Sequence, residues 1–141
     1  MANTLLMMVG LPRSGKSTWA RSQNVPIVNP DSIRLATHGK EFDPKYEGLV
    51  WFHARIMVES LFLAGHETVI LDATNGTQGR RSQWKDGPWE RRYVVNTTPA
   101  QTCIERAVAE NRPHMVPVIE KMAAEWQDVD VATEGGSIIY L

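Results

Sequence analysis

The stretch VGLPRSGKSTWA, residues 9–20, decides the fold of this chain. Its segment GLPRSGKS, at 10–17, matches the pattern G-x-x-x-x-G-K-[ST] in full. The apolar run TLLMMV at 4–9 predicts a buried strand before it, and residues 16–23 predict a helix after it. This order is typical of loops whose backbone N–H groups surround the phosphates of a nucleoside triphosphate. The sequence therefore predicts a nucleotide-binding site near its start.

The residue types of the loop suggest what each does. Glycines permit a tight loop that can approach phosphate closely. We expect Lys16 to reach the β- and γ-phosphates, the Ser17 hydroxyl to ligate Mg²⁺ and Thr18 to contact the α-phosphate. The predicted cofactors are thus ATP, or another nucleoside triphosphate, and Mg²⁺. The residues expected to bind the nucleotide from the loop are Gly10, Ser14, Gly15, Lys16, Ser17 and Thr18.

Apolar strand-like runs alternate with helix-like segments along the rest of the chain. We predict further strands at 25–29, 67–74, 92–96 and 135–141, and helices from Ser32, at 46–64, within 76–90, at 98–111 and at 117–127. Asp31 is predicted to cap the second helix and Thr98 to open the one at 98–111. The alternation predicts an α/β chain of one domain, 1–141, with a three-layer P-loop kinase fold: about five parallel strands, helices on both faces and a short arginine-bearing lid.

Composition narrows the classes of protein. The net charge of −1 gives no support to a large nucleic-acid footprint, although a small basic pocket is compatible with it. Cys103 is the one cysteine, so no intramolecular disulfide can form, and we expect it to be buried on a helix. No run approaches the ~20 apolar residues that span a bilayer. These features predict a cytoplasmic protein with no membrane partner.

The loop alone does not distinguish kinases from other nucleotide hydrolases. A base-reading N-K-x-D motif, typical of GTPases, is absent, and the chain is too short for the extra layers of a motor. A kinase needs an acceptor site, and NPDSIR at 29–34 is a candidate because it follows a predicted strand at the ligand-binding edge. Asp31 could accept a proton from an attacking hydroxyl, and Arg34, on the same helix face, could hold a phosphate of the acceptor. A helix cap and a surface arginine are the alternative.

GLPRSGKSTWA, VNPDSIR, LDATN with RRSQW, and ERAVAENRPHMVP follow one another along the chain. This order resembles the kinase domain of the phage T4-type polynucleotide 5′-hydroxyl kinases, over about residues 5–127. The resemblance implies that Asp31 is the general base, that Arg34 binds the phosphate next to the acceptor nucleoside, and that lid arginines clamp the donor phosphates. Arg106 and Arg112 are the candidates for the lid, and an ordinary helix pair of Arg106 with Glu110 is the alternative.

Other residues are expected near the site. Asp72 ends a predicted strand, where it could bind Mg²⁺ or brace Ser17 or Arg34. Thr74 and Asn75 are predicted to shape the acceptor pocket, and Arg13 either faces solvent or contacts a phosphate or the acceptor. Arg80 and Arg81 lie beside that pocket or on a solvated helix face. Trp84 and Trp89 are candidates for base stacking, with a core position as the favoured alternative.

The sequence predicts an ATP-dependent kinase of the 5′-hydroxyl of DNA or RNA, whose partner is a nucleic-acid 5′ end or a nucleotide. Its predicted catalytic residues are Lys16, Asp31, Arg34 and Arg112. One alternative is a kinase of a nucleoside, modified base or other small hydroxyl acceptor. Another is a nucleotide-binding switch without catalysis, which would leave Asp31, Arg34 and the lid arginines without a task.

Overall fold

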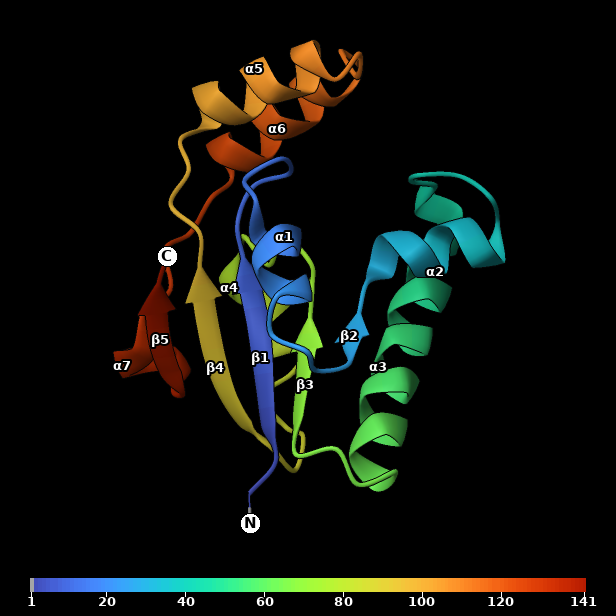
Figure 1. The fold of residues 1–141 in the computed structure, drawn as a ribbon, viewed down its shortest axis with the longest axis vertical. Helices are drawn as coiled ribbons and strands as arrows, with labels where there is room; N and C mark the ends of the chain where they lie inside the picture. The colour runs from blue at the N-terminus through green and yellow to red at the C-terminus, as the bar shows by residue number, and fades with distance from the viewer. Residues whose placement is uncertain (1) are drawn as a thin grey trace.

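A computed structural model describes residues 2–141, and its centre is a sheet of five strands that all run parallel. The strand order is β2-β3-β1-β4-β5, with the loop-bearing first strand in the middle (Figure 1). The strands are β1 (Thr4–Val9), β2 (Ile27–Val28), β3 (Thr68–Leu71), β4 (Glu90–Val95) and β5 (Ser137–Tyr140). The predicted α/β fold with a parallel sheet is confirmed.

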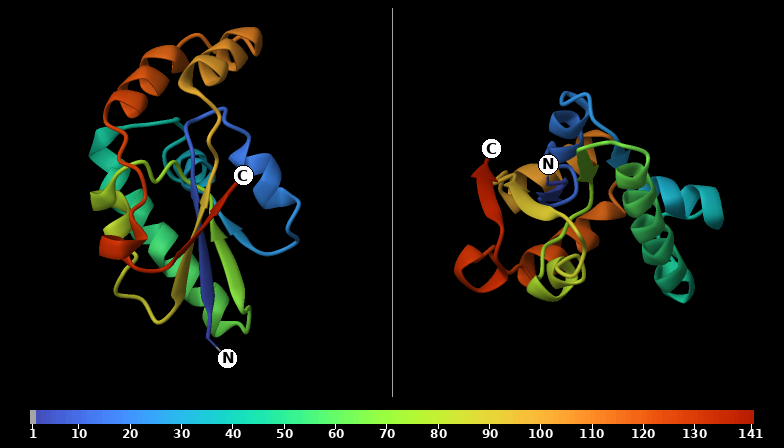
Figure 2. Two further views of the ribbon diagram at one scale, coloured as in Figure 1. Left: turned by 90° about the vertical axis from the view of Figure 1, so that its left-hand side faces the viewer. Right: turned by 90° about the horizontal axis from the view of Figure 1, so that it is seen from below.

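Helices cover both faces of the sheet. Helices α3 and α4 lie on one face and α1 lies on the other (Figure 2). The helices are α1 (Lys16–Arg21), α2 (Pro30–Thr37), a 3₁₀ turn η1 (Pro44–Tyr46), α3 (Glu47–Leu63), α4 (Gln78–Ser82), α5 (Ala100–Ala109), α6 (Met115–Ala124) and α7 (Val131–Glu134). The result is the three-layer arrangement that the alternating pattern predicts.

Strand β1 is central because its side chains are apolar on both faces. Leu5, Met7 and Val9 face the larger core with α3, and Met8 faces the smaller core with α1. All four are at most 1 % exposed. A strand buried on both sides reads as a continuous apolar run, which is why TLLMMV shows no alternation. This central position fixes where the loop after Val9 emerges.

A helical hairpin of α5 and α6 stands above the carboxyl edge of the sheet (Figure 1). It has its own small core of Cys103, Ala107 and Ile119, into which Leu11 of the loop also packs. Cys103 is fully buried, as predicted. This hairpin is the predicted lid, and its apolar contact with Leu11 joins it to the nucleotide-binding loop.

Two predicted helix starts are wrong. Asn29, not Asp31, caps α2, because its side-chain oxygen accepts hydrogen bonds from the backbone N–H groups of Asp31 and Ser32. Helix α5 begins after Pro99, and the Thr98 hydroxyl donates to the carbonyl of Ser14 instead. The sequence pattern does not indicate that the Thr98 side chain bonds to a residue distant in the sequence.

The tryptophan side chains after α4 belong to the core. Trp84 is 2 % exposed, and Trp89 packs against the same cluster and stacks on Phe62 at 5.6 Å between ring centroids. The core alternative for both residues is therefore confirmed. The proposal that they stack on bases is not supported by these positions.

Candidate active site

The nucleotide-binding loop leaves β1 and turns back into α1 through two residues with positive φ. Gly15 has φ 98° and Arg13 has φ 68°, a region that glycine adopts at no steric cost and arginine rarely does. A Cβ added to Gly10 would lie 2.7 Å from Ser14 Oγ, so the first glycine is needed for the close turn. The tightness of the loop therefore rests on these named residues.

A brace from the residues that follow strand β4 fixes the floor of the loop. The side chains of Asn96 and Thr98 both donate hydrogen bonds to the carbonyl of Ser14, each at 2.9 Å. These contacts orient the peptide between Ser14 and Gly15, and with it the N–H group that we expect to face phosphate. Neither brace residue was predicted, and no local pattern in the sequence indicates them.

Lys16 lies in the curve of the loop. Its Nζ donates to the Leu11 carbonyl at 3.4 Å. Burial lowers the pKa of Lys16, while the charges of Asp72 and Asp31 act in the opposite direction.

Asp72 connects the loop to the end of β3. Its Oδ2 accepts a hydrogen bond from Ser17 Oγ at 2.7 Å and one from Asn29 Nδ2 at 3.4 Å. Asp72 is 5 % exposed, and its buried Oδ1 has no partner among the residues that the structure describes. A hydroxyl and a carboxylate with a free oxygen form a donor set that suits Mg²⁺.

An ion-pair chain lies at the start of α2 and α3. Arg34 Nη1 donates to Asp31 Oδ1 at 2.6 Å, and its Nε and Nη2 form a bidentate pair with Glu47 at 2.9 and 2.7 Å. Burial alone would lower the pKa of Arg34, but the bond to Glu47 and the charge of Asp31 raise it above its ordinary value. The hydrogen bond from Arg34 lowers the pKa of Glu47. Arg34 thus holds Asp31 in place, and Glu47 holds Arg34.

The lid contacts the loop through Arg106 and Arg13. Arg106 Nη1 donates to the carbonyl of Arg13 at 3.1 Å, and the Arg13 guanidinium pairs with Glu110 at 2.5 Å. Glu110 therefore takes Arg13 as its partner, not Arg106 as the helix spacing allowed. Arg106 is placed beside the loop, where its charge can act on a nucleotide's phosphates.

The lid tip reaches across to the loop that follows α2. Arg112 Nη2 and His114 Nε2 both contact the carboxylate of Glu41, the latter at 3.1 Å. This contact bridges the space between the α5–α6 turn and the α2–η1 segment seen in Figure 1. Arg112 thus lies at the tip of the lid and pairs with Glu41, and its phosphate-binding role stays a prediction.

The segment after β3 is held by buried polar contacts. The Asn75 side chain donates to the Met8 carbonyl at 2.8 Å, and Thr74 accepts the N–H of Gly10 at 3.1 Å. Arg81 is fully buried, donates to the Asn75 carbonyl at 2.9 Å and pairs with Glu134 at 2.7 Å. The solvated position considered for Arg81 is wrong. The acceptor-site roles of Thr74 and Asn75 stay predictions.

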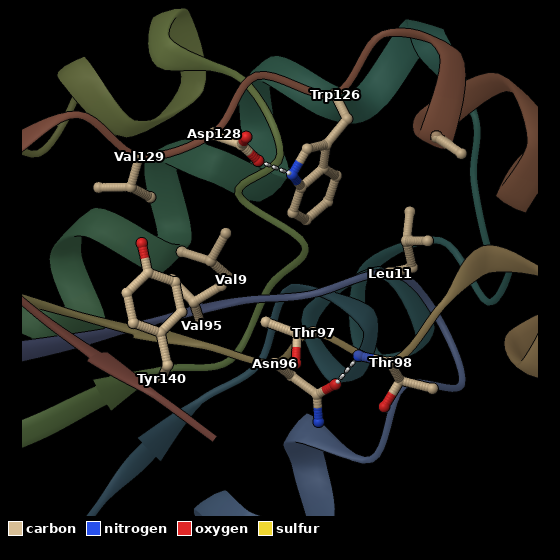
Figure 3. Close-up of a pocket in the computed structure, with 11 residues that line it drawn as sticks. Val9, Leu11, Val95, Asn96, Thr97, Thr98, Trp126, Asp128, Val129 and Tyr140 are labelled. Carbon is tan, nitrogen blue, oxygen red and sulfur yellow. Dashed lines mark hydrogen bonds between the residues drawn. The ribbon is translucent and has the colours of Figure 1, made fainter.

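A separate cavity of about 480 Å³ opens on the other side of the loop. Its lining includes Leu11, Asn96, Trp126 and Tyr140, and Figure 3 shows Trp126 and Tyr140 on opposite sides of it. The Asp31–Arg34 pair does not line it. None of the helices in residues 2–141 is long and apolar enough to cross a membrane, and these residues contain no His, Cys, Asp or Glu group of three or more that could hold a metal.

The sheet order and the loop, with Ser17 bonded to Asp72 at the sheet edge, define a P-loop kinase-like fold. A family model described as "AAA domain" matches residues 5–129, and the chain belongs to this family, AAA_33. No curated protein matches the chain.

Solved structures of several kinases share the fold. Two structures of the Pnkp1/Rnl/Hen1 complex, one described as an RNA repair complex, match with 19 % and 29 % identity and TM-scores of 0.66 and 0.65. They cover 89 % and 74 % of this chain, which spans only 47 % and 39 % of theirs. A sugar kinase from Janibacter sp. HTCC2649 matches at 17 % identity, TM-score 0.69, over 100 % of this chain and 85 % of its own. Mycobacterium tuberculosis APS kinase, solved with AMPPNP and APS, matches at 14 % identity, TM-score 0.64, over 99 % and 88 %.

Proposed function

We propose that the chain transfers the γ-phosphate of ATP to the 5′-hydroxyl of a nucleic-acid strand. The observation that carries the proposal is the Asp31–Arg34 pair, 2.6 Å apart, at the start of α2. It lies at the same sheet edge as Lys16 and Asp72, and the charge of Asp31 acts on Lys16. A carboxylate beside the donor loop, held by an arginine, suits an acceptor that carries both a hydroxyl and a phosphate.

In this proposal Asp31 and Arg34 have different roles toward the acceptor. Arg34 bonds only Oδ1 of Asp31, so Oδ2 remains to accept the proton of the attacking hydroxyl. Asp31 is mostly exposed, so a substrate can reach it, whereas Arg34 is 14 % exposed and stays fixed. The Glu47 pair prevents Arg34 from turning away. Positioning of this kind is the main contribution that a phosphoryl-transfer enzyme makes.

On the donor side, Gly15, Lys16 and Thr18 bind the phosphates in this proposal, and Arg106 adds its charge from the lid. Ser17 and Asp72 would hold Mg²⁺, which neutralises negative charge on the donor phosphates when bound. The shared hydrogen bond of Ser17 and Asp72 keeps both oxygens together. Arg13, paired with Glu110, supports the lid rather than the acceptor.

A kinase of a small hydroxyl compound is the second candidate. The sugar kinase and APS kinase folds match nearly the whole chain, and the net charge of −1 is compatible with a small acceptor. At 17 % and 14 % identity these likenesses concern the fold alone. The Pnkp1/Rnl/Hen1 complex, described in one structure as an RNA repair complex, matches at 19 % and 29 % identity and favours a nucleic-acid acceptor.

The test is transfer from labelled ATP to matched acceptors. The panel contains DNA and RNA oligonucleotides with 5′-hydroxyl ends, 3′-nucleotides, unphosphorylated nucleosides and sugars. We expect labelling of oligonucleotides and 3′-nucleotides, because both offer Arg34 a phosphate. Labelling confined to nucleosides or sugars would reject the polynucleotide function and the phosphate-binding role of Arg34.

The variant Asp31→Asn tests the proton acceptor. We expect kcat to fall ~10²–10⁴-fold, the range for loss of a general base, while ATP binding stays near the parent's value. Asp86→Asn is the matched control, since Asp86 is equally exposed and also pairs with an arginine, Arg55, far from the loop. Unchanged turnover in Asp31→Asn would show that Asp31 is not the base.

A further inference from the structure

A second arginine lies beside the Asp31–Arg34 pair. The guanidinium of Arg80, on α4, stacks over the ring of Trp51, on α3, with 4.3 Å from its carbon to the ring centroid. Both side chains are half-buried. Stacking on a ring face occupies the plane of a guanidinium but leaves its N–H edge available for hydrogen bonds. Trp51 therefore fixes the orientation of Arg80 without using its hydrogen-bond donors.

The two arginines differ in their partners. Arg34 already bonds Asp31 and Glu47, which leaves one N–H on Nη1 and one on Nη2 for a phosphate. Among residues 2–141, Arg80 forms no ion pair, and its one side-chain hydrogen bond is a long one of 3.4 Å to Gln83. A half-buried guanidinium without a carboxylate partner is an unusual arrangement, because burial of an unpaired charge is costly. An anionic ligand would supply the missing partner.

The spacing of the two arginines is set by one helix. Glu47 holds Arg34 and Trp51 holds Arg80, and these two α3 residues are four positions apart. Residues four apart lie on one face of a helix, about 6 Å along its axis. Arg34 of α2 and Arg80 of α4 are thus both held by side chains from one face of α3 near its start.

We propose that Arg80, held by Trp51, binds a second phosphate of the acceptor strand, one nucleotide beyond the phosphate next to the reacting sugar. This inference rests on the proposed function and names the acceptor class within it: a strand of two or more nucleotides is favoured over a mononucleotide. Arg34 binds the first phosphate and orients Asp31, and Arg80 binds the next phosphate along the strand.

The charge balance of the cluster agrees with this assignment. Burial lowers the pKa of Arg80, the positive charge of Arg34 lowers it further, and only Glu47 acts in the opposite direction. The carboxylate of Glu47 is itself engaged by Arg34 in a bidentate pair. A phosphate at Arg80 would relieve this repulsion and replace the water lost on burial with charge-assisted hydrogen bonds.

The experiment compares acceptors that differ by one phosphate. Steady-state kinetics would use a nucleoside 3′-monophosphate, a dinucleotide with a 3′-phosphate and a hexanucleotide, for the parent and Arg80→Gln. We expect the KM for the two longer acceptors to rise ~10-fold, the value of one charge-assisted contact, and the KM for the mononucleotide and for ATP to stay within twofold. The salt dependence of log KM for the hexanucleotide should weaken by about 0.7.

Arg55→Gln is the matched control, because Arg55 also stacks on a tryptophan, Trp89, at 4.8 Å but lies away from the loop. It should leave all three acceptors unchanged. Arg80→Lys keeps the charge but not the flat stack, so it should restore part of the affinity for the longer acceptors.

Three results would overturn the inference. The first is an unchanged KM of Arg80→Gln for the longer acceptors, and the second is an equal rise in KM for all three acceptors. The third is a parental KM for the longer acceptors in a variant without charge at this position, such as Arg80→Met. If Arg80→Gln does not fold, Arg80→Lys should still raise the KM for the longer acceptors and leave the KM for the mononucleotide unchanged. A parent enzyme that phosphorylates none of the three would instead refute the proposed function itself, and the inference with it.

Discussion

Glu134→Gln should destabilise the protein far more than a surface substitution of the same kind. Glu134 is the carboxylate partner of Arg81, whose side chain is completely buried, and the pair has bonds of 2.7 and 3.2 Å. Removing one member of a buried pair costs about 3–5 kcal/mol, because the other charge stays in the interior. Arg81 would keep its bonds to the carbonyls of Asn75 and Asp128, so we expect the lower end, about 3 kcal/mol.

The measurement is thermal and urea unfolding beside Glu59→Gln. Glu59 is half-exposed and pairs with Arg55 at i,i+4, a contact worth about 0.3–0.5 kcal/mol. A loss of 3 kcal/mol corresponds to a fall in Tm of about 6–12 °C in a chain of this size. If the two variants unfold within 2 °C of each other, the pair does not stabilise the fold as argued.

The pH dependence gives an independent check of the same pair. Burial alone would raise the pKa of Glu134, but the hydrogen bond from Arg81 lowers it below its ordinary value. A carboxyl with a lowered pKa in the folded state stabilises the protein above its unfolded pKa of ~4.3 and loses that contribution as the pH falls through the folded value. The stability gap between parent and Glu134→Gln should therefore narrow from pH 6 to pH 3. A gap that widens would refute the sign.

Two further variants address the loop and the lid. Gly10→Ala places a Cβ 2.7 Å from Ser14 Oγ, and overpacking of about 1–3 kcal/mol should raise the KM for ATP by about 5- to 150-fold. Gly48→Ala, with open space around it, should leave this KM unchanged, and an equal effect of both variants would contradict the argument. Glu41→Gln releases Arg112 from an exposed ion pair worth about 0.2–1 kcal/mol. If Arg112 binds the donor phosphates, the KM for ATP should fall up to about fivefold. A rise in this KM would show instead that Glu41 helps to close the lid.

The sequence predicted the parts of this molecule that depend on local patterns. The loop pattern and the apolar runs before Gly10 and up to Leu71 led directly to the sheet and to the edge where Ser17 and Asp72 meet. The pairing of Asp31 with Arg34 was also within reach, because residues three apart share a helix face. These predictions needed no knowledge of which distant elements come together.

Contacts between distant elements were not predictable in the same way. Glu47 is 13 residues from Arg34, and Glu41 is 71 residues from Arg112, so neither spacing carries a signal. Arg81 was expected on the surface because a charged residue in a polar segment gives no indication of burial. Its partner Glu134 lies 53 residues away in the sequence. The sites of such contacts follow only from the packing of the finished fold.

The brace between the loop and the segment that follows strand β4 has a mechanical consequence. Since the Thr98 side chain is bonded to the Ser14 carbonyl, and Gln127 N–H is bonded to the Gly76 carbonyl, both stems of the α5–α6 hairpin are fastened to the body of the protein. Rotation of the hairpin must then be absorbed between Thr98 and α5 and between α6 and Gln127. The hairpin also holds the loop directly through Leu11 and through the contacts of Arg106 and Glu110 with Arg13, so a swing of the hairpin would pull on the loop. Opening the lid and loosening the loop would then be one coupled event.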